Sequence, residues 1–284
     1  FEENAGEYWE APYLGIEKAW KEIADYNIVL KSLFYNQFSA SSFKQKVNDL
    51  LEINPDAVVL APTFVEESIQ LCHQLDDRGI PYIFIDSNIE AVNNMAYFGQ
   101  HSYQSGFLAA RLLESGLNEE SKIAIFSPEG EALSNQSISR EKGFVSYFEE
   151  RKIRQRYQFL TCRYDVVNEA KREQQIINFL EKNRTVSAAL VFNSRVCDIA
   201  RIIETHQMKG IKLLGYDLLK ENEDFLRKDI ITFLIAQRPE EQGYRSVSSL
   251  FNALVLKREI VKNQYIPIDI LTKENLEFYI NFTK

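Results

Sequence analysis

The sequence lacks long hydrophobic runs and an excess of basic residues, and each absence excludes a class of protein. No apolar stretch approaches the roughly 18 residues of a membrane-spanning helix. The 33 Lys and Arg residues are outnumbered by 41 Asp and Glu, which gives a formal net charge of -8. Because binding to the nucleic-acid backbone requires a basic surface, any contact with DNA must come from a segment other than this one.

Cysteines are also few. Cys72, Cys162 and Cys197 lie far apart in helix-like or strand-like contexts. An odd number of distant cysteines fits a reducing compartment better than a disulfide framework, so we expect a cytoplasmic protein. His73 follows Cys72 within a helical pattern that lacks further metal-ligand spacing, and we predict neither a metal site nor a cofactor.

Common catalytic motifs are absent as well. The sequence contains no G-x-S-x-G elbow, no P-loop, no G-x-G-x-x-G and no H-E-x-x-H. Two carboxylates, Asp86 and Asp217, could in principle act as the acid and base of a glycosidase. Nothing marks a nucleophile, and we therefore predict a binding protein and not an enzyme.

Short apolar runs alternate with stretches of helical periodicity along the whole chain. At 284 residues the chain exceeds the usual size of a single core, so two domains are expected. The pattern predicts strands at 27–35, 57–61, 81–86, 95–99, 122–127, 157–161, 187–192, 212–217 and 231–236, and helices at 12–24, 41–53, 65–79, 102–116, 137–150, 166–182 and 195–206. This alternation is typical of an α/β fold with two doubly wound lobes, each a parallel sheet covered by helices on both faces.

Several predicted strands end at a polar residue. These residues are Asp86, Asn193, Asp217 and Gln237. In parallel α/β sheets ligands bind outside the carboxyl ends of the strands, so these side chains indicate a binding site. Two alternatives remain open at this point: such residues also serve as helix N-caps, worth about 1 kcal/mol each, or as plain polar residues at a strand exit.

Seven segments occur in an order and spacing that resemble a known family. They are NPDAVVLAPT, GIPYIFIDS, FGQHSYQSGFLAARLL, SISREKGF, LVFNS, LLGYD and IAQRPEEQGY. The chain resembles the type I periplasmic sugar-binding protein fold, and more closely the effector domain of transcriptional regulators of the lactose-repressor (LacI/GalR) type. The resemblance implies lobes of residues 1–101 plus 238–266 and 102–237 plus 267–284, joined by three crossovers near His101, Gln237 and Pro267.

The resemblance also implies a ligand site. Its residues would be Tyr8, Trp9, Asp86, Arg140, Asn193, Asp217 and Gln237, with the two aromatics against a sugar ring. Carboxylates, amides and a guanidinium suit a polyol, because together they accept from and donate to hydroxyl groups. The chain departs from the ribose-binding pattern at Ala61, where asparagine is usual, and at Ser87, where arginine often follows the aspartate.

Simpler roles compete with this site. Arg140 could be a solvated charge on a helix, and Tyr8 and Trp9 could be core or interface aromatics. Three function classes stay open: a regulator's effector domain, an extracytoplasmic sugar-binding protein of a transporter or sensor, and a sugar-acting enzyme. For the regulator we expect a helix-turn-helix within about 70 residues upstream of Phe1, a length that the resemblance implies. The first lobe would lack the strand that normally precedes this point, so either Phe1 continues such a strand or the lobe is completed in another way. We also expect a homodimer whose first-lobe surface is the helical stretch 64–75, with Cys72 and Leu75 among its apolar residues.

Overall fold

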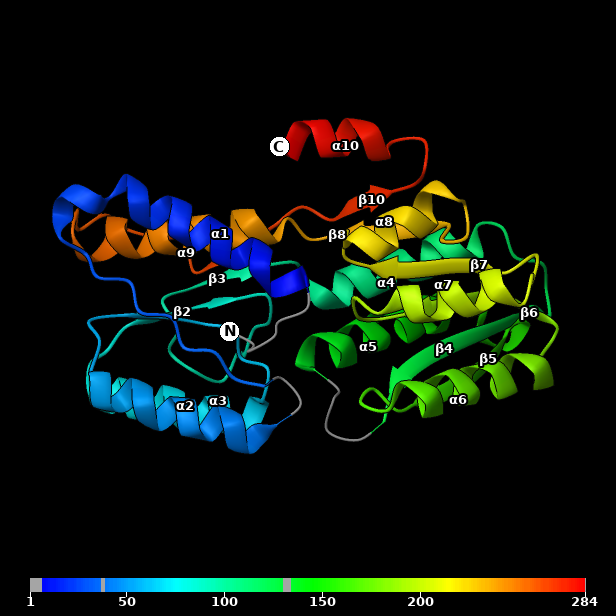
Figure 1. Ribbon diagram of the computed structural model, residues 1–284, viewed down its shortest axis with the longest axis horizontal. Coiled ribbons are helices and arrows are strands. Elements are labelled where there is room, and N and C mark those ends of the chain that lie inside the picture. The colour runs from blue at the N-terminus through cyan, green and yellow to red at the C-terminus, as the bar shows by residue number, and fades with distance from the viewer. Residues whose placement is uncertain (1–6, 37–38, 130–133, 284) are drawn as a thin grey trace. The chain divides into compact units, whose positions relative to one another are not determined.

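A computed structural model describes residues 7–36, 39–129 and 134–283 (Figure 1). The chain forms two compact units, which are described separately. The first comprises the described parts of Phe1–His101, Ser134–Gln136 and Arg238–Pro267, and the second the described parts of Ser102–Leu133, Ser137–Gln237 and Ile268–Lys284. Within these described ranges, no helix is both long and apolar enough to cross a membrane.

The first unit is built on a four-stranded parallel sheet. Its strands β1 (Val58–Leu60), β2 (Tyr82–Ile85), β3 (Ala96–Gly99) and β9 (Asn263–Tyr265) lie in the order β1-β2-β3-β9. Successive side chains of a strand point to opposite faces. Tyr82 and Phe84 therefore pack in one core with α2 (Ala40–Ile53) and α3 (Val65–Asp77), and Ile83 and Ile85 in another with α9 (Pro239–Leu254).

Helix α1 (Glu7–Glu22) packs along α9 by direct contact of the two backbones (Figure 1). A Cβ atom added at Gly15 of α1 would lie within 3.0 Å of the Glu240 carbonyl oxygen, and one at Gly243 of α9 would meet the Pro12 carbonyl oxygen equally closely. Real Cβ atoms essentially never approach so near. Each helix thus presents a glycine to a carbonyl group of the other, and the short 3-10 helix Ala24–Tyr26 follows α1.

The second unit is built on a six-stranded sheet. Strands β10 (Asp269–Leu271), β8 (Phe233–Ala236), β7 (Lys212–Tyr216), β6 (Val186–Val191), β4 (Lys122–Pro128) and β5 (Gln158–Tyr164) lie in that order, with β10 antiparallel to β8 and the other pairs parallel. One face packs against α4 (Ser102–Glu114) and α5 (Asn135–Glu150). The other face packs against α6 (Glu169–Lys182), α7 (Val196–Thr205), α8 (Lys220–Arg227) and α10 (Leu276–Thr283). A 3-10 helix, Arg154–Arg156, precedes β5.

Helices α4 and α5 repeat the glycine contact seen in the first unit. A Cβ atom at Gly106 would collide with the Arg140 carbonyl oxygen, and one at Gly143 with the Tyr103 carbonyl oxygen. The backbone of α5 at Arg140 is therefore seated directly on α4. This contact fixes the point from which the Arg140 side chain departs.

The architecture confirms the predicted α/β fold with two doubly wound, parallel-sheet lobes. The predicted strand at 27–35 is wrong: the segment is non-regular apart from a single bridge residue, Tyr35. Asn27 is the C-cap of the preceding 3-10 helix and has a left-handed backbone with φ of 54°, which is not the conformation of an extended strand. Instead Ile28 accepts from the Trp20 indole at 2.7 Å, and Val29 is 77% exposed. Sequence analysis did not predict α8, β9, β10 or α10.

The expected dimer surface on α3 also needs correction. Cys72 and Leu75 are completely buried in the core between α3 and the sheet of their own unit. The exposed residues of α3 include Glu66, Gln70 and His73, which are polar. The helical spacing of the apolar residues therefore marks the inward face of α3 and provides no apolar docking surface.

Candidate functional site

The first unit brings Tyr8, Trp9 and Asp86 together. Tyr8 is at the start of α1, and its hydroxyl donates to the Asp86 carboxylate at the end of β2. The Trp9 ring meets Tyr8 edge to face, with the centroids 5.1 Å apart and the planes at 84°. Residues 78 positions apart in the chain thus form one polar and aromatic cluster, as the resemblance implied for this half of the site.

The backbone of Asp86 is held in the left-handed region, with φ of 64°. Its N–H donates to the Phe98 carbonyl of the next strand and to the Gln242 side chain at 2.9 Å. Its carbonyl accepts from the Tyr97 hydroxyl at 3.0 Å and from Gln136, which the structure groups with this unit. Gln136 also donates to the carboxylate at 3.3 Å. Sequence analysis missed these supporting residues because each lies far from Asp86 in the chain.

In the second unit, Arg140 extends from α5 toward the carboxyl ends of the strands. One guanidinium nitrogen, Nη1, donates to the Phe192 carbonyl at 2.8 Å, and the group lies over the Tyr216 ring at 3.8 Å from its centroid. The side chain is 1% exposed, which rules out the solvated-charge alternative. Burial raises the pKa of the Tyr216 phenol, and the adjacent Arg140 opposes this rise.

Asp217 and Gln237 occupy neighbouring strand ends in the same unit. The Gln237 amide donates to the Asp217 carboxylate at 2.6 Å, and both side chains are buried. The backbone of Asp217 is in the left-handed region, with φ of 70°, and its N–H donates to the Ile235 carbonyl of β8. The two residues follow β7 and β8, which are paired in parallel. The structure thus brings them together as expected for strands that end at one edge of a sheet.

Asn193 lies between β6 and α7 at the same edge. Its side-chain oxygen accepts from the Arg195 N–H at 3.0 Å, so it closes a local turn. Burial raises the pKa of the nearby Tyr164 phenol. The capping alternative fails for Asn193 and Asp217, because the N-caps of α7 and α8 are Arg195 and Leu219. It fails for Asp86 because the next helix, α4, begins only at Ser102.

Both clusters contain buried polar atoms without a hydrogen-bond partner in the described parts of the chain. In the second unit these are Nε and Nη2 of Arg140, and in the first they are Ser87 Oγ and Asn88 Oδ1. An unsatisfied buried polar group costs about 1–3 kcal/mol, and more if it is charged. Nε–H and Nη2–H form one edge of the guanidinium and can donate side by side to two oxygens. These atoms are suited to hydrogen-bond a polar ligand.

The two clusters offer the groups that a sugar requires. Asp86 and Asp217 can accept from hydroxyls, Arg140 and the amides can donate, and Trp9 supplies an apolar ring face. In the described ranges, no group of three or more His, Cys, Asp or Glu side chains is placed to hold a metal ion. Each cluster therefore gathers hydrogen-bonding groups from distant parts of the chain.

Comparisons with known proteins support the two-lobe α/β fold. No curated protein sequence matches the chain. A Bacteroides fragilis protein described provisionally as a LacI transcriptional regulator is 34% identical, with 98% of this chain and 96% of that chain covered and a TM-score of 0.92. GanP, a glucose-galactose binding protein from Geobacillus stearothermophilus, is 20% identical over 97% and 96% of the two chains, with a TM-score of 0.85.

A third similar structure is a transporter solute-binding protein from Burkholderia graminis in complex with D-arabinose. It is 17% identical, covers 96% of this chain and 93% of its own, and has a TM-score of 0.85, so it shows the fold alone. The model of the periplasmic binding protein domain family matches residues 2–258. With its doubly wound sheets and its match across most of the sequence, the chain belongs to the periplasmic binding protein domain family.

Proposed function

We propose that the chain binds a sugar through Tyr8, Trp9, Asp86, Arg140, Asn193, Asp217 and Gln237. The observation that carries this proposal is Arg140, whose Nε and Nη2 are buried without a partner among the residues that the structure describes. A ligand oxygen would satisfy these charged donors, which are costly to leave unbonded. The similar structures named for glucose and galactose binding, or bound to D-arabinose, support a sugar as that ligand.

The test is calorimetric titration of the purified chain with D-glucose, D-galactose, D-arabinose and D-tagatose, the sugars named for similar structures, and with a wider panel of aldoses. We expect saturable binding of at least one sugar. An Arg140→Met variant is the matched control, since Met retains an apolar stem and loses the donors, and its affinity should fall sharply. If no sugar of the wide panel binds the wild-type chain, the proposal is wrong.

We further propose that the chain is the effector-binding part of a cytoplasmic transcriptional regulator that works as a homodimer. The 34% identity to the Bacteroides fragilis protein over nearly the whole chain supports this choice, as do three unpaired cysteines. A sugar that binds the closed form better than the open form would shift the population, and a DNA-binding segment would sense that shift. Contact with DNA would then be made by that segment alone.

The alternative is an extracytoplasmic sugar-binding protein of a transporter or sensor, which the similar transporter proteins favour. The sequence upstream of Phe1 distinguishes the regulator from the extracytoplasmic binding protein. A helix-turn-helix there would support the regulator, and a secretion signal would support the extracytoplasmic binding protein. Light scattering provides a second test, because a strictly monomeric chain at high concentration would contradict the dimer.

We also propose that no catalysis occurs, and conversion of a bound sugar during prolonged incubation would overturn this.

A further inference from the structure

Asn222 connects two segments that carry proposed ligand-binding residues. It is the third residue of α8, and its side chain is completely buried. The side-chain amide nitrogen lies 2.9 Å from the Ser194 carbonyl oxygen, 2.9 Å from that of Asp217 and 3.3 Å from that of Tyr216. The side-chain oxygen accepts from the Cys197 N–H at 3.1 Å. A single amide thus joins the segment that follows β6 to the segment that follows β7.

The Asp217 end of this connection needs support. An aspartate in the left-handed region is strained, at a cost of order 1–3 kcal/mol, and persists where surrounding contacts determine it. The Asp217 N–H is held by Ile235, its carboxylate by Gln237 and its carbonyl by Asn222. The last of these contacts acts on the carbonyl group of the peptide that follows Asp217. Removing it weakens the restraint on the orientation of that peptide.

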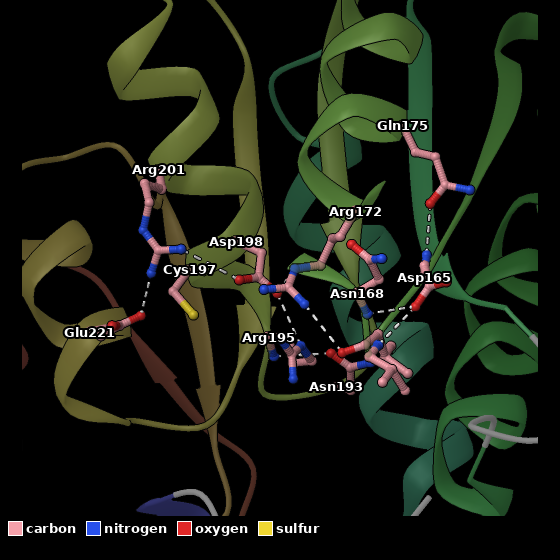
Figure 2. Close-up of polar contacts among 12 residues, drawn as sticks. Asp165, Asn168, Arg172, Gln175, Asn193, Arg195, Cys197, Asp198, Arg201 and Glu221 are labelled. Atoms are coloured by element: carbon pink, nitrogen blue, oxygen red, sulfur yellow. Dashed lines mark hydrogen bonds and ion pairs between the residues drawn. The ribbon is translucent and has the colours of Figure 1, made fainter. Parts of the chain in front are cut away.

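The segment that contains Asn193 is held by two sets of contacts. One is the bond from Asn222 to the Ser194 carbonyl, and the other is the set of ion pairs around Asp198 shown in Figure 2. Asn193 accepts from the Arg195 N–H, and the Arg195 side chain donates to Asp198 at 3.0 Å. Asp198 is buried and also pairs with Arg172 at 3.3 Å and with Arg201 at 3.7 Å. Arg172 in turn donates to the Val166 carbonyl at the start of the neighbouring α6 segment. The turn is therefore anchored by ion pairs toward α6 and by Asn222 toward α8.

We propose that Asn222 is a positioning residue: it sets the orientation of Asp217 relative to Asn193 and thereby the affinity for the sugar. This inference rests on the proposed function and extends it to a residue that touches no ligand. Both halves of the amide are used, the N–H₂ group toward carbonyls and the oxygen toward a backbone N–H. Aspartate has the same shape but would place a carboxylate oxygen against three carbonyls.

The experiment uses the full chain and the sugar of the panel that binds the wild type most tightly. Asn222→Asp and Asn222→Ala should each weaken binding by about tenfold or more, because a displaced peptide misplaces the Asp217 carboxylate. Leu180→Ala is the control: Leu180 is buried in the hydrophobic core of the second unit and lies on α6, outside both strand-end segments. It should lower the melting temperature while leaving the affinity within about twofold of the wild type.

A double-mutant cycle separates positioning from a general loss of stability. If Asn222 acts through Asp217, the Asn222→Ala substitution should have little further effect on affinity in an Asp217→Asn background, whereas independent effects would add. Additive effects, or unchanged affinity of the Asn222 variants while the wild type binds sugar, would overturn this inference alone. Failure of the wild type to bind any sugar of the panel would overturn the proposed function and the inference with it.

Discussion

Asp86 and Asp217 adopt the same backbone conformation in the two units. Each directly follows a parallel strand, each has a positive φ, of 64° and 70°, and each donates its N–H to a carbonyl of the adjacent strand. In each unit this N–H makes the last hydrogen bond between the two parallel strands. The chain then turns in a backbone conformation that glycine would adopt more easily. Both positions thus carry a carboxylate in a backbone conformation that favours glycine but that aspartate also tolerates.

Substitutions at Asp86 should separate the strain from the binding role. Asp86→Gly and Asp86→Ala both delete the carboxylate, so both should lose sugar affinity. Glycine relieves the left-handed backbone, and the Gly variant should unfold with a free energy about 1 kcal/mol higher than the Ala variant. Denaturant titration and calorimetry measure the two effects. The same pair of substitutions at Asp217 is the control, and equal stability of the Gly and Ala variants at both sites would contradict the argument.

Arg140→Ala should lose sugar binding and also stability. The buried guanidinium donates to Phe192 and stacks on Tyr216, so its removal also takes away contacts within the second unit. Loss of the charged donor should cost about 1.5–3 kcal/mol in binding. Calorimetry at a temperature well below the melting point measures affinity in the folded variant. Unaltered affinity would remove Arg140 from the ligand site.

Gln237→Ala tests whether this residue couples occupancy to domain closure. Gln237 bonds Asp217 and ends the strand before the crossing to α9, where Arg238 is left-handed and Pro239 begins the helix. The variant should bind sugar more weakly and compact less in small-angle scattering at saturating sugar. Compaction as complete as in the wild type would leave Gln237 as a pocket residue without a coupling role.

Gly106→Ala should destabilise the second unit. The added methyl group would collide with the Arg140 carbonyl oxygen, and overpacking of this kind typically costs about 1–3 kcal/mol. Arg111→Ala, an exposed change on the same helix, is the matched control and should be nearly neutral. Thermal unfolding of both variants checks the prediction. A Gly106→Ala variant as stable as the wild type would show that α4 and α5 can separate without cost.

The three thiols should be unreactive in the native protein. Burial raises the pKa of Cys72 to about 11 and that of Cys162 and Cys197 to about 12, whereas an unfolded thiol titrates near 8.5. Their contribution to stability is therefore complete below about pH 8.5 and is lost as the pH rises through 11 to 12. Labelling with a disulfide reagent at pH 8 should be slow without denaturant and fast in it. Rapid labelling of the native chain would contradict this.

The sequence allowed the fold, and the gathering of polar residues at the carboxyl ends of the strands, to be predicted, because both depend on local patterns. Strand-length apolar runs with a polar last residue correctly placed Asp217 and Gln237 side by side. The strand predicted at 27–35 failed since apolar periodicity does not reveal the left-handed backbone of Asn27. Gln242 and Asn222 were missed for a different reason: each bonds a backbone group that only the folded chain brings near. No signal in a single sequence distinguishes such an amide from an ordinary polar residue on a helix.

The reciprocal glycines of α1 and α9 have a mechanical consequence. Gly15 touches the first turn of α9, and Gly243 touches α1 near Pro12, so neither backbone can slide without pushing the other. Helix α9 begins immediately after the crossing at Arg238, and α1 begins with Tyr8 and Trp9 close to its first residue. Because their backbones are in direct contact, α1 and α9 are expected to move together as one rigid body. Any torsion at Arg238 that moves α9 within its unit must therefore carry the aromatic pair with it.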